Sequence, residues 1–349
     1  MVIKLEPLRS LSTFLRRRVE PLFVRSGKYE RKIDLSDQLV ADFGRHRSGL
    51  KYGLRYLRVL QNPKGSVLDA FVERTFIWNG AGVKSHLRPW IGFIHVPPHV
   101  PEWFHSEHSN DVLIASGAWK ESLPYCRGLF AMSAYHKKHL EKKLDVPVDS
   151  LHLPTETPRI KWSWGEFQSN RQKKIVQVGW WLRKLHAIYQ LPRCDYGKIF
   201  LSVEHPSLPH LIAKERELLI SEGTFTWDMY DTVETCSFLS NEEYDRLLSR
   251  NIVFFYLYDA SASNAIIECI ARNTPLLVNP IEPVQEYLGS DYPFYYQSLE
   301  EAVSKAMDFD LVYRTHQFLV NHPDKEKLSG RYFLDSFANS EIYRDLQLV

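Results

Sequence analysis

The sequence lacks the features that identify several common protein classes. Its four cysteines, Cys126, Cys194, Cys236 and Cys269, lie far apart and form no Cys-x-x-Cys pair. This spacing supports neither a disulfide framework nor a zinc ribbon, and it fits reduced thiols in a cytoplasmic protein. No stretch approaches the roughly 18–20 consecutive apolar residues that a membrane span requires.

Several catalytic motifs are also missing. The chain contains no GxGxxG, no GxxxxGK[ST] and no GxSxG segment. These segments are typical of dinucleotide oxidoreductases, P-loop kinases and α/β-hydrolases, so those three classes lose their usual support.

The charge balance excludes a further class of partner. The chain has 44 Lys+Arg against 42 Asp+Glu, a formal net charge of +2. Such a chain has no large basic field, so we expect no nucleic-acid partner. With 349 residues, 25% of them charged and 13% aromatic, the sequence predicts two ordered domains.

The N-terminal segment combines apolar residues at helical spacing with basic neighbours. Leu5, Leu8, Leu11 and Leu15 recur along one face, and Arg16–Arg18 follow them. The charged residues interrupt the apolar core that a signal peptide needs. A basic amphipathic helix either docks on its own domain or lies on an anionic membrane surface. We therefore expect a cytoplasmic protein, with weak membrane-surface contact as the alternative.

The second half of the chain alternates between strand and helix patterns. Ser240 and Glu243 form a capping box at the start of one of these helices. The predicted strands are 174–179, 197–203, 233–239, 252–258, 275–279 and 293–296, and the helices 208–221, 241–250, 264–272, 282–288 and 298–307. This alternation predicts a parallel, doubly wound sheet.

The first half is less regular but of the same kind. Its predicted strands are 90–96, 111–116, 127–132 and 149–153, and Ser133 caps a helix over 133–143. A linker follows at 154–158. The fold class is therefore α/β, with two Rossmann-like domains facing a cleft. We place the domains at 1–158 and 159–325, with a C-terminal helix in 326–349.

Two segments of the second domain follow the ends of predicted strands and carry candidate ligand-binding residues. Ligands of open parallel sheets bind at the carboxyl ends of the strands. The small residues of Asp259–Asn264 precede the start of a helix, and the free backbone N–H groups at a helix start favour binding of a diphosphate. Glu268, one helical turn later, can accept hydrogen bonds from a ribose diol. Gly179 ends another strand, and Arg183 and Lys184 follow it as phosphate ligands. The alternative is a solvated turn and two surface cations.

This layout resembles the GT-B glycosyltransferases, and most closely their retaining members. The resemblance is carried by Arg183-Lys184, by 259–268 and by Thr274-Pro275. The first Glu of the family's Glu-x7-Glu motif is replaced by Ala260. The resemblance implies a nucleotide-sugar donor, with Asp259 or Asn264 at the transferred sugar. The implied donor-binding residues are Gly179, Arg183, Lys184, Ser261, Ser263, Asn264 and Glu268.

The acceptor side is expected in the first domain, on the proline-rich loop after strand 90–96. His95 matches a histidine that GT-B enzymes often place beside the donor. Further acceptor-side candidates are His99, Trp103, His105 and Glu107, which are otherwise surface polar residues and core aromatics. An inverting enzyme would use Glu102, His95 or Glu107 as its base, whereas a retaining enzyme needs none from the protein. We expect retention and assign His95, Glu102 and Asp259 as the catalytic candidates.

No cofactor and no metal site are predicted. His105-x-x-His108 with Glu102 or Glu107 has zinc-ligand character, but the HExxH arrangement on a helix is missing. Asp308-Phe309-Asp310 has the form of the metal-binding DxD motif of GT-A enzymes. It follows the last helix of the second domain, away from any donor, and is expected to be a loop.

The sequence thus predicts a metal-independent glycosyltransferase that moves a sugar from a nucleotide-diphosphate donor to a glycan or other hydroxyl acceptor. Two alternatives share the architecture. One is a nucleotide-sugar epimerase, and the other is a non-catalytic α/β protein that binds a nucleotide or glycan.

Overall fold

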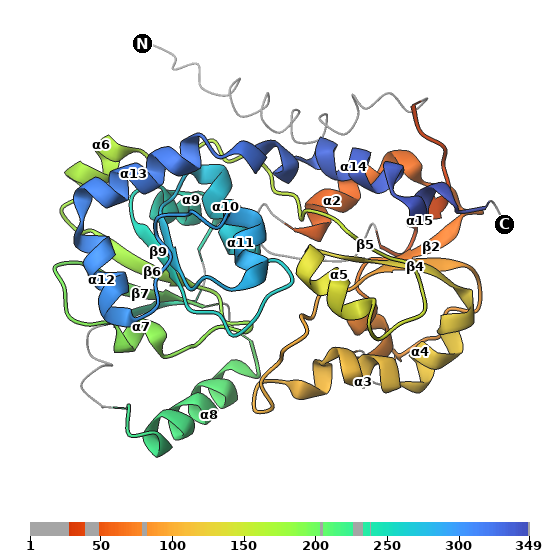
Figure 1. Cartoon of the computed structure of the whole chain (residues 1–349), viewed down its shortest axis with the longest axis horizontal. Coiled ribbons are helices and arrows are strands. Elements are labelled where there is room, and N and C mark those ends of the chain that lie inside the picture. Colours follow the sequence, from red (N-terminus) through yellow and green to blue (C-terminus); the bar gives the residue numbers. More distant parts are fainter. Residues whose placement is uncertain are drawn as a thin grey trace, which may run out of the picture.

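Two parallel five-stranded sheets, each flanked by helices, form the molecule (Figure 1). The computed structural model describes residues 28–38, 49–78, 82–202, 205–225, 233–237 and 239–347. The sheet orders are β1-β2-β3-β4-β5 and β10-β9-β6-β7-β8, and the strand pairs are parallel. The predicted α/β class with two Rossmann-like sheets is confirmed. The predicted amphipathic helix around Leu5–Leu15 lies outside the described residues.

The elements of the first sheet are short. Its strands are β1 (Ile33–Asp34), β2 (Ser66–Asp69), β3 (Trp90–Phe93), β4 (Cys126–Ala131) and β5 (Val148–Ser150), and its α-helices are α2 (Leu50–Leu57), α3 (Asn110–Ala115), α4 (Gly117–Ser122) and α5 (Ala134–Leu140).

The second sheet has longer helices. Its strands are β6 (Lys174–Val178), β7 (Gly197–Leu201), β8 (Val233–Cys236), β9 (Ile252–Phe255) and β10 (Leu276–Val278). Its helices are α6 (Trp164–Ser169), α7 (Ala187–Gln190), α8 (Leu208–Ser221), α9 (Asn241–Ser249), α10 (Asn264–Arg272), α11 (Glu282–Leu288), α12 (Leu299–Met307) and α13 (Phe309–Val320).

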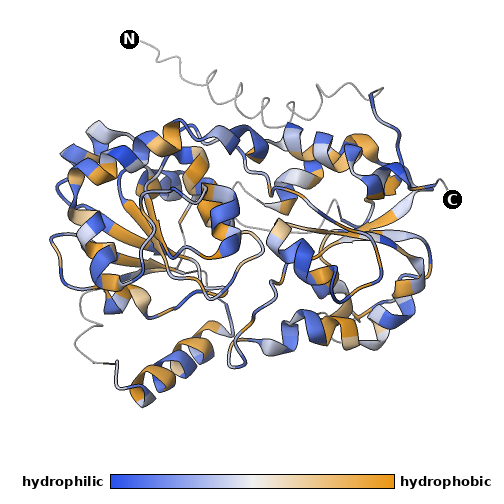
Figure 2. Cartoon of the chain, in the orientation of Figure 1, coloured by the Kyte–Doolittle hydropathy of each residue, from blue (hydrophilic) through white to orange (hydrophobic). Residues whose placement is uncertain are grey.

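Apolar strands lie at the centre of each sheet, and helices cover them (Figure 2). All four residues of β9 are buried, as expected for a strand of a parallel sheet that is covered on both faces. Among the described residues, none of the helices combines the length and apolar character needed to cross a membrane.

The chain crosses between the two sheets twice. After α13, the chain returns to the first sheet through α14 (Gly330–Asn339) and α15 (Glu341–Arg344). Phe337 of α14 packs on Phe93 and Phe130, with ring centroids 6.0 and 5.0 Å apart. The two crossing segments are joined where the Thr155 amide donates to the Leu328 carbonyl at 2.9 Å.

Several predicted elements differ from the structure. The predicted strand 111–116 is helix α3, because the Ser109 side chain accepts from the Val112 amide and caps it. Segment 293–296 makes only an isolated bridge between Val278 and Tyr295. The predicted loop at the DxD segment is a helix start, since the Asp308 side chain caps α13. Strands β1 and β2 and helices α2, α4, α6, α7 and α13 had not been predicted.

Candidate functional site

The order of the second sheet creates the candidate site. Strands β6 and β9 are neighbours at the centre of the sheet. Strands β7 and β8 follow on the β6 side and β10 on the β9 side, so the strand order reverses between β6 and β9. Such a switch point opens a crevice at the carboxyl ends of the two strands. A cavity of about 180 Å³ lies there, and the loop after β3 forms its wall on the side of the first domain. It is lined by His95, Pro97, Trp181, Leu182, Arg183, Leu257 and residues 259–264.

Arg183 is the cation of this cavity. Its backbone bridges to Leu257 after β9, and its guanidinium donates to the Trp181 carbonyl at 2.9 Å and to the Ser263 hydroxyl at 3.3 Å. Its Nε is buried without a hydrogen-bond partner among the described residues. Burial lowers the pKa of Arg183 to about 10, so it remains charged at neutral pH. A half-buried charge with an unused donor is well suited to bind an anion.

Gly179 forms the turn that positions Arg183. The residue follows β6 with φ 74°, in the left-handed region that glycine adopts without a side-chain clash. A Cβ atom at this position would lie 3.4 Å from Arg183 Cζ. The glycine is therefore required by the turn of the chain rather than by lack of space, because 3.4 Å is an ordinary van der Waals distance.

The start of α10 faces the same cavity. Its N-cap residue Ser263 makes no side-chain cap hydrogen bond, and Ser263 and Asn264 both line the cavity. The first backbone N–H groups of a helix have no partner within the helix and carry a partial positive charge. Together with Arg183, they give this cavity two features that favour a phosphate group.

Ser261 is held in the cavity wall by the first domain. Its Oγ accepts from the Met132 amide at 3.3 Å and lies 2.8 Å from His136 Nδ1. Asn110 Nδ2 donates to His136 Nε2, which assigns the ring proton to Nδ1 and makes Ser261 the acceptor. Burial lowers the pKa of His136 to about 3, so the ring is neutral. The Ser261 hydroxyl hydrogen is left to donate to a ligand.

His95 lies in the cavity wall as a neutral imidazole. Its Nε2 donates to the Ala70 carbonyl at 2.9 Å, and the ring stacks on Phe71 with centroids 4.1 Å apart. Burial lowers the pKa of His95 to about 4. Because Nε2 carries the proton, Nδ1 is a hydrogen-bond acceptor and suits a sugar hydroxyl.

Glu73 holds the segment that carries His95. Its Oε1 accepts from the amides of His95 and Val96 at 2.6 and 2.7 Å. The Oε2 atom is buried and has no partner among the described residues. Burial raises the pKa of Glu73 to about 7.

Asp259 joins the two domains at the cavity. Its Oδ2 accepts from the His99 amide at 2.9 Å and from the Tyr135 hydroxyl at 3.0 Å, and its Oδ1 accepts from the Ala260 amide. Burial raises the pKa of Asp259 above its ordinary value. The carboxylate thus contributes to both domain closure and the cavity wall.

Three predicted donor-binding residues, Gly179, Lys184 and Glu268, do not line this cavity. The Lys184 ammonium lies 3.9 Å from the centre of the Tyr256 ring, and the residue is not part of the cavity wall. Glu268 is 2% exposed; its Oε2 accepts from the Tyr244 hydroxyl at 2.6 Å and lies 3.9 Å from Arg272. The expectation that this carboxylate contacts a ribose does not match this buried position.

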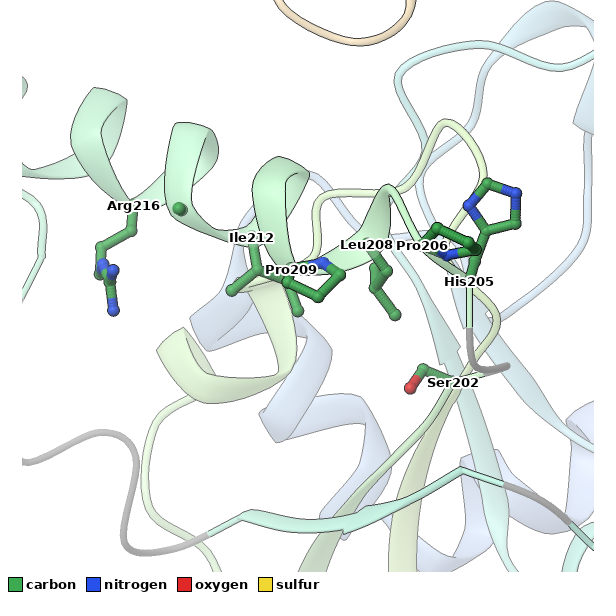
Figure 3. Close-up of a pocket in the computed structure, with 8 residues that line it drawn as sticks. Ser202, His205, Pro206, Leu208, Pro209, Ile212 and Arg216 are labelled. Carbon is green, nitrogen blue, oxygen red and sulfur yellow. The ribbon is translucent and has the colours of Figure 1, made fainter.

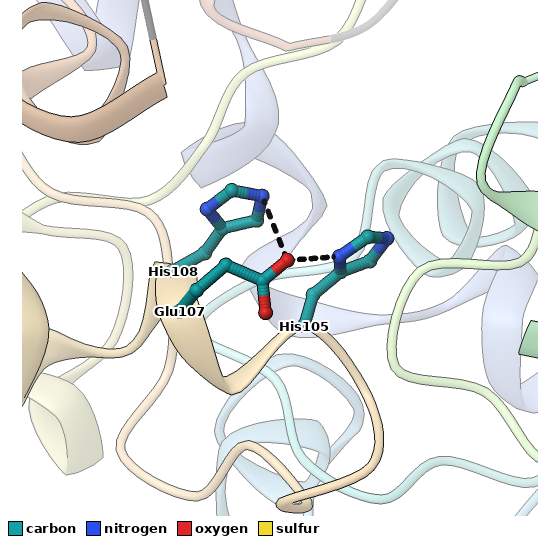
Figure 4. A group of neighbouring side chains, drawn as sticks. All are labelled: His105, Glu107 and His108. Atoms are coloured by element: carbon teal, nitrogen blue, oxygen red, sulfur yellow. Dashed lines mark hydrogen bonds and ion pairs between the residues drawn. The ribbon is translucent and has the colours of Figure 1, made fainter. Parts of the chain in front are cut away.

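The acceptor-side candidates separate into three places. Trp103 packs edge-on against Tyr258 of the second domain, with centroids 5.7 Å apart, and the His99 amide binds Asp259. Glu102 is exposed and makes no hydrogen bond or ion pair with a described residue, so its position does not favour a role as base. His105 and Glu107 lie together with His108 (Figure 4).

The sequence reasoning missed Glu73, Tyr135 and His136. Tyr135 and His136 follow the carboxyl end of β4 and the cap Ser133, a location that the strand-end rule covers for both domains. No sequence pattern pointed to Glu73, since its importance depends on burial against the loop after β3.

A second hollow follows β7 along the same sheet edge (Figure 3). It has a volume of about 720 Å³ and is lined mainly by Ser202, His205, Pro206, Leu208, Ile212 and Arg216, with α8 as one wall. The His205 ring packs against Trp180 with ring centroids 4.6 Å apart and a tilt of 33°. Trp180 precedes Trp181, which lines the smaller cavity.

Known structures share the fold of this chain. The chain aligns with an α,α-trehalose-phosphate synthase (UDP-forming) from Burkholderia vietnamiensis, with a TM-score of 0.53, 13% identity, and coverage of 85% of this chain and 78% of that one. It has the GT-B fold. Anabaena HepE, solved with UDP and glucose, aligns with a TM-score of 0.53 and 9% identity over 72% of this chain and 71% of that one.

A third GT-B structure is similar. WaaG, a glycosyltransferase involved in lipopolysaccharide biosynthesis, aligns with a TM-score of 0.50 and 14% identity over 78% of this chain and 77% of that one. No protein-family model and no curated protein matches the chain by sequence.

Proposed function

We propose that this GT-B protein transfers a sugar from a nucleotide-diphosphate donor to a hydroxyl acceptor such as a glycan, with retention of configuration and without a metal ion at the diphosphate. One observation carries the proposal. The half-buried guanidinium of Arg183 and the uncapped start of α10 meet in one cavity at the switch point. Both stabilise negative charge that develops on a departing diphosphate, which is usually the largest catalytic contribution.

The donor is proposed to extend from this cavity along the sheet edge. A volume of about 180 Å³ is below the range of roughly 300–1,000 Å³ for whole ligand sites, so it takes the diphosphate and sugar only. The hollow of about 720 Å³ beside α8 then takes the nucleoside. HepE was solved with UDP and glucose, which supports a uridine donor as the first to test.

The surrounding residues are proposed to orient the sugar. Ser261 donates to it or to the diphosphate, and His95 Nδ1 accepts from one of its hydroxyls. Retention requires no protein base, and three observations favour it. His95 is neutral, Asp259 is hydrogen-bonded to Tyr135, and Glu102 is exposed.

A nucleotide screen tests the proposal. UDP, GDP and ADP are compared by thermal shift, and the binding nucleotide's sugar donors are then incubated with and without a panel of monosaccharide and sugar-phosphate acceptors. A transferase releases nucleoside diphosphate only with an acceptor, and NMR of the product shows the anomeric configuration. Sugar conversion without acceptor would indicate an epimerase, and binding without turnover a non-catalytic protein.

Arg183→Ala supplies the test at the residue. Loss of a charge-assisted hydrogen bond costs about 1.5–3 kcal/mol, so we expect nucleoside-diphosphate affinity to fall about 10- to 150-fold by calorimetry. Lys184→Ala is the matched control, because this neighbouring cation does not line the cavity. Its affinity should stay within about fivefold of the wild type. Equal losses in the two variants would contradict the assignment of Arg183.

A further inference from the structure

We propose that His105, Glu107 and His108 bind one divalent transition-metal ion, for which Zn²⁺ is the best-suited common ion. The three side chains come from the loop after β3 in the first domain (Figure 4). The proposed sugar transfer does not depend on this ion, since the diphosphate site lies at Arg183 and α10.

The ligand atoms already converge. His105 Nδ1 lies 2.6 Å from Glu107 Oε1, and His108 Nε2 lies 3.8 Å from the same oxygen. All three ligand atoms lie within 4.8 Å of one another. Tetrahedral zinc with bonds of about 2.0–2.1 Å separates its ligand atoms by about 3.3 Å, a value between the two observed distances. Small side-chain movements therefore suffice to admit an ion.

The donor set selects the kind of ion. Two imidazole nitrogens and one carboxylate oxygen match zinc and related divalent ions, whereas Mg²⁺ and Ca²⁺ prefer oxygen ligands alone. Three protein ligands leave a fourth position for water or another oxygen or nitrogen donor.

Within the described part of the chain, no other hydrogen bond or ion pair explains the orientation of the two rings. The outer nitrogens, His105 Nε2 and His108 Nδ1, are buried without a hydrogen-bond partner among the described residues. Glu107 is thus the polar group that both rings face in Figure 4. An ion between the three groups would replace this contact with stronger bonds.

Aromatic rings from both domains cover the two histidines, and the Glu107 side chain is 60% exposed. Trp78 packs against His108 with centroids 5.2 Å apart, and Trp181 of the second domain stacks on His105 at 6.0 Å and 18°. Apolar walls of this kind limit the access of water to a metal site. The ion would fix the loop that the first domain presents to the cleft.

A zinc titration tests the proposal. Tag-free full-length protein is stripped with EDTA, and Zn²⁺ is added in competition with a chromophoric chelator. We expect one equivalent to bind, and the double variant His105→Ala/His108→Ala to bind at least about 100-fold more weakly. Glu107→Gln should weaken binding in the same direction. His210→Ala removes an exposed histidine of α8 and should leave the affinity unchanged.

A spectroscopic measurement covers the case in which the double variant does not fold. Co²⁺ added to stripped wild-type protein should give the intense visible absorption of a tetrahedral, histidine-ligated ion, and Zn²⁺ should displace it. A wild type without stoichiometric binding, a featureless Co²⁺ spectrum, or equal affinity in the folded double variant would overturn the proposal. UDP thermal shifts measured in parallel report on the donor site, so failure of the metal site and failure of the proposed function are distinguishable.

Discussion

At the scale of single residues, burial sets the charge of the side chains around the cavity. His95 and His136 are neutral because burial lowers their pKa values to about 4 and about 3. Glu73 shows the opposite effect, since burial raises its pKa to about 7. Ionisation of Glu73 therefore works against the fold, and this can be measured.

The pH dependence of Glu73 has a defined direction. Its ordinary pKa is 4.5, so below that pH the carboxyl is protonated in both the folded and the unfolded chain. Between pH 4.5 and about 7 the folded protein keeps a proton that the unfolded chain releases, and the contribution of Glu73 to stability falls as the pH rises. The loss amounts to about 3 kcal/mol and is complete above pH 7.

Glu73→Gln tests this expectation. The variant keeps an acceptor for the His95 and Val96 amides but cannot ionise. Urea unfolding of both proteins from pH 4.5 to pH 8 should show the free energy of unfolding of the wild type falling by about 3 kcal/mol relative to the variant. Parallel curves for the two proteins would show that Glu73 does not titrate in this range.

Residue identity alone did not separate Arg183 from its neighbour. The sequence places both cations after β6, but the turn that begins at Gly179 sends one into the cavity and the other onto Tyr256. Glu268 is a similar case. Its spacing from Asn264 puts it one turn into α10, and only the packing of α9 shows that it meets Tyr244.

At the scale of elements, Gly179 connects β6 to the cavity and offers a second prediction. Gly179→Ala should lower the free energy of unfolding by about 1–2 kcal/mol, because alanine is disfavoured at φ 74°. Because the turn at Gly179 leads directly into Arg183, its distortion should also lower nucleoside-diphosphate affinity, measured by calorimetry.

Gly223→Ala is the control for this variant. Gly223 has φ 68° after α8, and a Cβ atom there would meet nothing within 4 Å. The substitution should cost similar stability without weakening nucleotide binding. If both variants lost affinity alike, the effect of Gly179 would not come from its place in the turn that leads to Arg183.

The predictability of each element depended on local signals. The capping box of Ser240 and Glu243 starts α9 with both of its hydrogen bonds. The segment 111–116 was predicted wrongly because a short apolar run fits strand and helix alike, and the cap at Ser109 decides between them. β1 has only two residues, too few for any alternation to be visible.

At the scale of the whole molecule, hydrogen bonds close the two domains on each other. The Glu286 side chain of α11 accepts from the amides of Ala134 and Tyr135 at 2.7 and 2.6 Å, so the second domain caps a helix of the first. Glu286→Ala should remove this cap, and the exchange of both amides with deuterium should accelerate about tenfold or more.

An exposed carboxyl on the next helix serves as the comparison. Glu300→Ala, in the first turn of α12, should leave the exchange of these amides unchanged. Protection of Ala134 and Tyr135 that survives the loss of Glu286 would show that the domains are held closed by other contacts, such as that of Asp259 with Tyr135.

The GT-B architecture was predictable from strand and helix alternation, whereas the contacts across the cleft were not. Tyr135 bonds to Asp259 and His136 bonds to Ser261, and the two residues of each pair lie more than 120 residues apart in the sequence. Their pairing depends on how the sheets face each other. Local sequence patterns carry no information about contacts between residues that are so far apart in the sequence.

The pair of crossings joined by Thr155 and Leu328 limits how the protein can open. Two adjacent connections restrain twisting and sliding far more than one would, and they leave rotation about a single axis as the easy motion. Such a rotation would part Asp259 from Tyr135 while Arg183 and α10, both carried by one sheet, kept their spacing. A donor could then enter and leave a diphosphate site that stays assembled throughout each opening.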